Sequence, residues 1–124
     1  VVPFFGVPTL TGTLTTKLAA RTGCRLVGLS CLRGADGNGF VVYCDALTDT
    51  DLWARDATRS TAALNRAIEA MIARDPAQYV WGYRRFKGVP NFKGIYRKDW
   101  QTVQRAVAQF HGVTAILPPN PRMV

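Results

Sequence analysis

Residues 56–87 read DATRSTAALNRAIEAMIARDPAQYVWGYRRFK, and this stretch decides the architecture of the chain. Its apolar residues recur at helical spacing: Leu64, Ile68, Met71 and Ile72. This period predicts an amphipathic helix over about residues 56–74. Asp56 favours the positive N-terminal end of such a helix, and Pro76 ends it. One or two further helical turns are expected before Lys87.

The residues before this helix predict a strand end, a short helix and a hairpin. Residues 1–8 are expected to form the end of a strand that runs into a loop, because their two prolines cannot donate ladder hydrogen bonds. A helix is predicted over about residues 12–22, with Leu14 and Leu18 on one face and Gly23 at its C-terminal end. Two apolar runs separated by turn residues predict a β-hairpin over residues 25–44.

The C-terminal part of the chain gives weaker patterns. Residues 88–97 contain two glycines and a proline and predict irregular structure, whereas residues 98–110 show helical spacing. The proline-rich residues 117–121 are expected to be extended. No internal repeat or linker separates two domains, so we expect residues 1–124 to be a single partial domain. Because the sequence starts at a valine, we expect it to be an excised piece.

Positive charge is concentrated in one segment of this basic chain. The 124 residues carry 16 Lys and Arg against 8 Asp and Glu, a formal charge of +8. Residues 81–105 hold seven of those basic residues against one Asp, interleaved with aromatic side chains. Such a field attracts an anionic partner: nucleic acid, an acidic protein or phosphorylated lipid. A solvated basic face without a partner is the alternative. No apolar run reaches the roughly 18 residues of a membrane-spanning helix.

Catalytic chemistry is incomplete in this sequence. The single histidine, His111, has no acidic residue after it, so a histidine–carboxylate base cannot start there. The single glutamate, Glu69, is predicted to lie exposed in the middle of a helix. Cys24, Cys31 and Cys44 match neither a disulfide framework nor a zinc pattern, and three reduced thiols are expected. We therefore expect no catalytic residue, no metal and no cofactor in this chain.

One ordered pattern is specific to a family. Its letters are Asn65-x-x-Ile68-Glu69-x-x-Ile72-x-x-x-Pro76-x-Gln78-Tyr79-x-Trp81-x-x-Arg84-Arg85-Phe86-Lys87. This pattern resembles the C-terminal signature of the bacterial lipid A biosynthesis acyltransferases, the late lauroyl and myristoyl transferases. The earlier block Val2-Pro3-Phe4-Phe5-Gly6-x-Pro8 is similar to the one that precedes the family's threonine-rich helix. The resemblance covers residues 1–88 and leaves 89–124 as an unplaced C-terminal extension.

The resemblance implies a fold and a reaction. The fold is α/β, with a mixed sheet flanked by helices, and the family carries an N-terminal membrane anchor. The reaction moves a fatty acyl chain from acyl carrier protein to a hydroxyl of a phosphorylated lipid A precursor. The family's His-x-x-x-x-Asp/Glu base lies upstream of the matched region, so this chain resembles a C-terminal fragment that is inactive alone. The resemblance also implies a location at the cytoplasmic face of the bacterial inner membrane.

Seven residues are predicted to bind substrate within this resemblance: Arg84, Arg85, Lys87, Trp81, Gln78, Phe4 and Phe5. The cations would hold sugar phosphates or the acidic carrier, and Phe4 and Phe5 would line an apolar slot with Leu14. Structural alternatives stay open. Phe4 and Phe5 can be core residues, and Gln78, Tyr79 and Trp81 can form a clamp. The two arginines can pair internally with one of three acidic residues: Asp45, Asp49 and Asp51.

Two other functions remain as alternatives at this point. A nucleic-acid-binding module would use the basic aromatic segment 81–105 for stacking and phosphate contacts. A non-catalytic peripheral membrane module would use its charge against anionic lipid. Composition supports the nucleic-acid reading about as well as the transferase reading, but the ordered pattern between Pro76 and Lys87 does not. We therefore expect no nucleic-acid partner.

Overall fold

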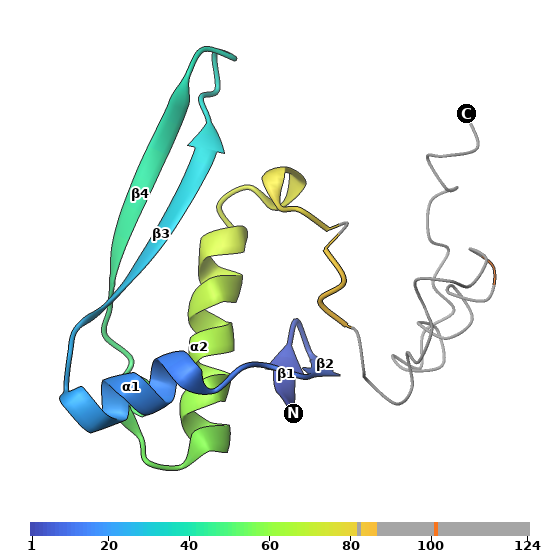
Figure 1. Ribbon diagram of the computed structural model, residues 1–124. Helices are drawn as coiled ribbons and strands as arrows, with labels where there is room; N and C mark the ends of the chain where they lie inside the picture. The colour runs from blue at the N-terminus through green and yellow to red at the C-terminus, as the bar shows by residue number, and fades with distance from the viewer. Residues whose placement is uncertain (82, 87–100, 102–124) are drawn as a thin grey trace. The chain divides into compact units, whose positions relative to one another are not determined.

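The computed structural model describes residues 1–81, 83–86 and 101. The chain divides into two units, Val1–Tyr83 and Arg84–Val124, and the elements below belong to the first. Figure 1 shows them in chain order from blue to yellow. The expected irregular segment at 88–97, most of the expected helix at 98–110 and the extended tail lie outside the described residues.

The N-terminal residues form a small hairpin, where a strand running into a loop was expected. Strand β1 (Val2–Phe4) pairs antiparallel with β2 (Val7–Thr9), and Pro3 lies opposite Pro8. Paired residues of an antiparallel ladder exchange hydrogen bonds only at alternate positions. The two prolines occupy the same rung, so neither removes a bond from the rungs on either side.

Helix α1 (Leu14–Thr22) begins two residues later than expected and ends at Gly23, as predicted. Gly23 has a φ of 67°, the left-handed conformation in which glycine carries no Cβ penalty. The two leucines do not form the packing face, because Leu14 and Leu18 are 71% and 51% exposed. The buried residues of α1 are instead small: Thr16 and Ala19.

The predicted β-hairpin is confirmed and is longer than expected. Strand β3 (Leu26–Arg33) pairs antiparallel with β4 (Phe40–Leu47) along its full length. Gly28 lies on the side that faces the helices, and a Cβ built there would come within 2.6 Å of the Met71 sulfur. Glycine at this position therefore allows the strand and the helix to approach closely.

The predicted long helix is confirmed as α2 (Ala57–Ile72). The Asp56 side chain caps it by accepting a hydrogen bond from the Arg59 N–H at 2.9 Å. Short 3₁₀ helices precede and follow it: η1 (Thr50–Trp53) and η2 (Pro76–Gln78). Neither helix α1 nor α2, the two α-helices among the described residues, is long and apolar enough to cross a membrane.

The core forms where α2 contacts β1, η1, α1 and β3 (Figure 1). Its fully buried large apolar side chains are Phe4 and Leu52. Much of the remaining buried surface is small or polar: Ala19, Ala63, Thr9, Thr16, Ser60, Thr61 and Asn65. Small side chains let the two helices lie close together, but polar ones require hydrogen-bond partners when they are buried.

The α/β class is confirmed by these elements. Within the described residues both sheets are two-stranded and antiparallel. The larger mixed sheet that the resemblance implies therefore remains an expectation for a longer polypeptide.

Candidate functional site

The turn between β1 and β2 is the most unusual backbone feature of the described residues. Phe5 has a φ of 47° and Gly6 a φ of 75°. Positive φ at both central positions is typical of the type I′ hairpin turn. A phenylalanine rarely adopts this conformation, and such strain costs about 1–3 kcal/mol. The surrounding structure must therefore hold Phe5 in place.

Two side chains of α2 hold this turn. The Phe5 N–H donates to Glu69 Oε1 at 2.7 Å, and the Asn65 side-chain amide donates to the Pro3 carbonyl at 2.6 Å. Asn65 and Glu69 are four residues apart, so they lie on one face of the helix. Two side chains of the family pattern over residues 65–87 thus hold the earlier block, residues 2–8, in place.

Asn65 also binds the loop that follows β2. Its amide nitrogen lies 3.1 Å from the Thr11 hydroxyl, and its oxygen lies 3.3 Å from the same hydroxyl. Asn65 is fully buried, so these bonds supply the partners that a buried amide requires. Residues far apart in the sequence are therefore joined by one side chain.

The expectation that Glu69 lies exposed in the middle of the helix was wrong. Glu69 is half-buried and accepts the Phe5 N–H. The family pattern contains both Asn65 and Glu69, and helical spacing predicts their place on α2 but not their partners. The available signal was the pair of polar residues four apart, Asn65 and Glu69, which lie on one face of this amphipathic helix.

An aromatic cluster surrounds the turn. The ring centroids of Phe4 and Phe5 are 4.9 Å apart, and those of Phe5 and Trp81 are 5.9 Å apart. Tyr79 packs edge-on against Trp81 at 4.8 Å. The Trp81 indole N–H donates to the Pro76 carbonyl at 2.7 Å, which fixes the ring. Three of the predicted substrate-binding residues, Phe4, Phe5 and Trp81, therefore lie together.

These aromatic residues differ in exposure. Phe4 is fully buried, which fits the core alternative, whereas Phe5 and Trp81 are 40% and 49% exposed. Phe5 and Trp81 thus offer ring surface to a ligand while Phe4 supports them. Their binding role stays a prediction.

Gln78 lies apart from the aromatic cluster and connects η2 to β3. Its side-chain oxygen accepts from the Arg33 N–H at 2.7 Å, and its nitrogen donates to the Arg33 carbonyl at 3.3 Å. The same nitrogen donates to Asp75 Oδ2 at 2.7 Å. This geometry fits the clamp alternative for Gln78.

The predicted cations fall at the limit of the described chain. Arg84 is exposed and Arg85 is half-buried, and both belong to the second unit. Lys87 lies outside the described residues. Their predicted contact with an anionic substrate therefore stays a prediction, and so does the role of the basic segment beyond them.

The three acidic residues considered as internal partners are bound by arginines of the first unit. Arg74 forms a two-pronged pair with Asp45, and Arg66 binds Asp49 at 2.7 Å. Asp51 pairs with Arg59 at 2.6 Å. The hydrogen bond from Arg74 lowers the pKa of Asp45, and the bond from Arg66 together with the Asp51 N–H lowers the pKa of Asp49.

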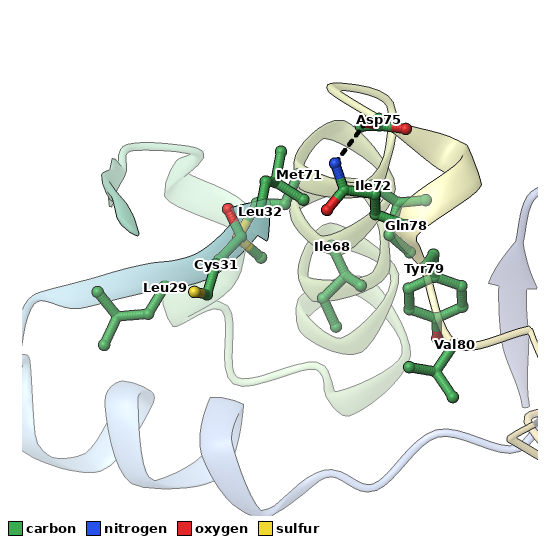
Figure 2. A pocket seen from close by; sticks show the side chains of 11 residues that line it. Leu29, Cys31, Leu32, Ile68, Met71, Ile72, Asp75, Gln78, Tyr79 and Val80 are labelled. Carbon is green, nitrogen blue, oxygen red and sulfur yellow. Dashed lines mark hydrogen bonds between the residues drawn. The ribbon is translucent and has the colours of Figure 1, made fainter. Parts of the chain in front are cut away.

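An apolar cavity near these elements lies away from the expected slot (Figure 2). A cavity of about 240 Å³ lies between β3, the C-terminal half of α2 and the segment that begins with η2. Phe4, Phe5 and Leu14 are not among its lining residues. Their part in an acyl slot is supported only by the resemblance.

Metal chemistry finds no support in the described part of the chain. No group of three or more His, Cys, Asp or Glu residues is placed there to hold an ion. Cys24, Cys31 and Cys44 are exposed thiols in the structure. His111 lies outside the described residues.

Comparison with known proteins identifies the family. The model of the bacterial lipid A biosynthesis acyltransferases matches residues 1–88. A lipid A biosynthesis acyltransferase of Haemophilus influenzae is 38% identical over 96 residues, covering 74% of this chain and 30% of that relative. The Escherichia coli palmitoleoyltransferase of lipid A biosynthesis is 32% identical over 89 residues, covering 71% and 28%. The corresponding lauroyltransferase is 35% identical over 100 residues, covering 73% and 31%.

The chain belongs to the bacterial lipid A biosynthesis acyltransferase family. It spans less than a third of the length of these relatives. The two blocks that the structure joins, the Phe-Phe-Gly turn and the helix of Asn65 and Glu69, both lie within the matched residues.

Proposed function

We propose that this chain is part of an acyltransferase acting at the cytoplasmic face of the bacterial inner membrane. The enzyme transfers a fatty acyl chain from acyl carrier protein to a hydroxyl of a lipid A precursor. The acceptor oxygen forms an ester with the acyl carbonyl carbon, and the carrier's thiol leaves. Family membership and the names of the lauroyl and palmitoleoyl transferases support this reaction.

One observation carries the proposal into this chain. Asn65 and Glu69 hold the strained Phe-Phe-Gly turn from the far end of the matched sequence, at separations of 62 and 64 residues. Backbone strain of this kind persists where the surrounding structure enforces it, and it clusters at ligand and active sites. The turn presents Phe5 beside Trp81 on the surface, where a substrate can contact both rings.

In this proposal the chain binds substrate and another part of the enzyme supplies the base. Phe5 and Trp81 contact the substrate, and Arg84, Arg85 and Lys87 bind its phosphates or the acidic carrier. Arginine suits this task because its planar fork makes paired hydrogen bonds to phosphate or carboxylate. A nucleic-acid function would rest on residues 81–105, and the structure describes too few of them to favour it.

The chain alone is expected to show no acyl transfer. It lacks a histidine followed by an acid at the spacing of a general base. The assay supplies acyl carrier protein thioester and lipid A precursor and detects product by mass. Turnover above the protein-free control, lost on changing His111, would contradict this assignment of roles.

The binding role of the arginines is tested in a chimera. The Haemophilus influenzae relative receives residues 1–88 of this chain in place of the segment they match. Arg84→Ala or Arg85→Ala should lower kcat/KM by about tenfold to a hundredfold, because each charge-assisted bond contributes about 1.5–3 kcal/mol. Lysine at either position should recover only part of the loss, because it lacks the planar fork.

A thermal midpoint measured on the same preparations separates binding from folding. If the arginines bind substrate, the substitutions should leave the thermal midpoint unchanged. Raised salt should then lower kcat/KM in the unsubstituted chimera as the substitutions do. An Arg84→Ala chimera with a lowered midpoint and full specific activity would remove Arg84 from the binding site.

A further inference from the structure

Another cavity lies between α1 and the start of α2. It measures about 390 Å³, within the range of about 300–1,000 Å³ that is typical of small-molecule sites. α1 lines one side of it, and the first turn of α2 with the two residues before its cap lines the other. The residues that shape it are Lys17, Arg21, Ala54, Arg55, Ala57 and Ser60.

The charged side chains that line this cavity are all positive. Lys17 and Arg21 are four residues apart, so they lie on one face of α1. Arg55 lines the cavity from the segment before α2. Within the part of the chain that the structure describes, none of the three forms an ion pair. Like charges four residues apart on a helix repel, so this arrangement costs stability unless an anion lies between them.

The acidic side chains of the described residues are each bound elsewhere. Asp45, Asp49 and Asp51 pair with arginines, as described above. The others accept backbone N–H groups: Asp36, Asp56, Glu69 and Asp75. None of these carboxylates lines the cavity. An anion that balances its three cations must therefore come from outside the residues that the structure describes.

The N-terminal end of α2 adds a positive field at this cavity. α2 is 16 residues long, and the first N–H groups of a helix have no partner within the helix. Asp56 caps the Arg59 N–H. No acceptor among the described residues binds the N–H groups of Ala57 and Thr58. Since Ala57 lines the cavity, this uncapped part of the helix end borders the three cations.

We propose that this cavity binds a phosphate monoester group, held by Lys17, Arg21 and Arg55. At neutral pH such a group carries close to two negative charges and three acceptor oxygens, which suits three cations better than a single carboxylate does. Arginine makes paired hydrogen bonds to phosphate, and a helix N-terminus favours the same anion. The site uses different residues from the proposed substrate-binding cations, and it does not depend on the proposed reaction.

Titration of the intact 124-residue chain with glucosamine 1-phosphate tests the site. The backbone amide NMR shifts of Lys17, Arg21, Ala57 and Thr58 should change together and saturate, and raised salt should weaken the binding. Acetate at equal ionic strength should bind at least about fivefold more weakly, because it offers one charge and two oxygens. Shifts that do not saturate, or equal affinity for acetate, would overturn the proposal.

Three single variants separate the site from the overall charge of the chain. Arg21→Gln and Arg55→Gln should each weaken binding by about threefold to fivefold, the range expected for exposed ion pairs. Arg25→Gln is the matched control, because Arg25 is exposed and does not line the cavity. It removes the same charge and should change the affinity by less than about 1.5-fold. An equal loss in the control would overturn the proposal.

The thermal midpoint without phosphate distinguishes a binding role from a structural one. Arg21→Gln should not lower the midpoint, because the substitution removes the repulsion between Arg21 and Lys17. Glucosamine 1-phosphate should raise the midpoint of the parent chain more than that of the variant. A lowered midpoint together with unchanged affinity would make Arg21 a structural residue and overturn its assignment here.

Vesicle binding identifies the molecule that carries the phosphate. Phosphatidic acid in phosphatidylcholine vesicles presents the same monoester on a lipid. Sedimentation with these vesicles that Arg21→Gln and Arg55→Gln weaken, and Arg25→Gln does not, would assign the site to a phospholipid head group. Binding of glucosamine 1-phosphate without such sedimentation would assign it to a phosphorylated sugar. Failure of both probes would overturn the proposal, whereas the proposed acyl transfer is decided separately by the chimera.

Discussion

Phe5 and Glu69 show how one residue's backbone depends on another residue's side chain. Phe5 has a φ of 47°, and its N–H is held by Glu69 Oε1 at 2.7 Å. The aromatic contacts with Phe4 and Trp81 hold the ring of the same residue. The backbone and the side chain of Phe5 are thus fixed by different partners, and a substitution can remove one partner without the other.

Glu69→Ala should destabilise the chain by about 1.5–3 kcal/mol, because it removes the charged acceptor of the Phe5 N–H. Urea unfolding followed by circular dichroism measures the loss. Glu69→Gln is the matched control: it keeps an acceptor oxygen without the charge, so it should lose less than Glu69→Ala. Equal losses in the two variants, or none in either, would show that this bond does not hold the turn.

The sequence predicts the helix that contains Asn65 and Glu69, but it does not predict their hydrogen bonds to Pro3 and Phe5. Helical period depends on neighbours three and four residues apart, so it is readable from a short window. The bonds of Asn65 to Pro3 and of Glu69 to Phe5 cross more than sixty residues. No local pattern encodes such a separation, and a helix-face glutamate usually lies in solvent.

At the scale of elements, an ion pair joins the hairpin to α2. Arg74, just beyond the helix, binds Asp45 of β4, lies 3.3 Å from the Ser30 hydroxyl of β3 and stacks over the Tyr43 ring at 4.8 Å. The positive charge of an arginine at a helix C-terminus interacts favourably with the helix dipole. In addition, the position of Arg74 connects the end of α2 to the β3–β4 hairpin.

This pair predicts an acid-dependent stability. The bond with Arg74 lowers the pKa of Asp45 below its usual value of 3.8. A lowered pKa in the folded state contributes stability above pH 3.8, and the contribution disappears as the pH falls through the folded value. The difference in thermal midpoint between the parent chain and Asp45→Asn should therefore be present at pH 6 and shrink below pH 3.8. Asp49 titrates in both proteins, so its effect cancels.

A constant difference from neutral to acidic pH would contradict this account. It would mean that Asp45→Asn changes stability through packing. The substitution would then have the same effect whether Asp45 of the parent chain is ionised or protonated.

The elements themselves were largely predictable, and their packing was not. Local signals identified α2, the β3–β4 hairpin and Gly23 at the end of α1, because period, turn residues and helix ends depend on adjacent residues. The β1–β2 hairpin was missed because prolines disfavour strands. Here Pro3 and Pro8 lie opposite each other, so neither interrupts the hydrogen bonds of the hairpin. Leu14 and Leu18 were expected on one face of α1, but the period does not show that the buried residues of this helix are Thr16 and Ala19.

At the scale of the whole molecule, the outer face of the hairpin is an exposed apolar surface. Val27, Leu29, Phe40 and Val42 are each more than half exposed. They lie on one face of the paired strands, because their positions are opposite or two residues apart in the register. Contiguous apolar surface of this kind marks a contact site or a tendency to aggregate.

The double variant Leu29→Thr, Val42→Thr should bind less of the dye ANS and dissolve to higher concentration than the parent chain. Threonine keeps the preference for strands, and exposed positions usually change stability by less than about 0.5 kcal/mol. Leu14→Thr is the control, because Leu14 is 71% exposed on α1, away from the hairpin. Dye binding that falls equally in the control would show that no single face is responsible.

The bonds from α2 to the Phe-Phe-Gly turn also have a consequence during protein synthesis. Phe5 is made 64 residues before Glu69, and Pro3 is made 62 residues before Asn65. Contacts of large sequence separation form late, because the intervening chain must first be closed into a loop. The turn therefore leaves the ribosome without the side chains that impose its left-handed phenylalanine. It acquires that geometry only when the second helix has emerged, so a strained feature made early is among the last to be fixed.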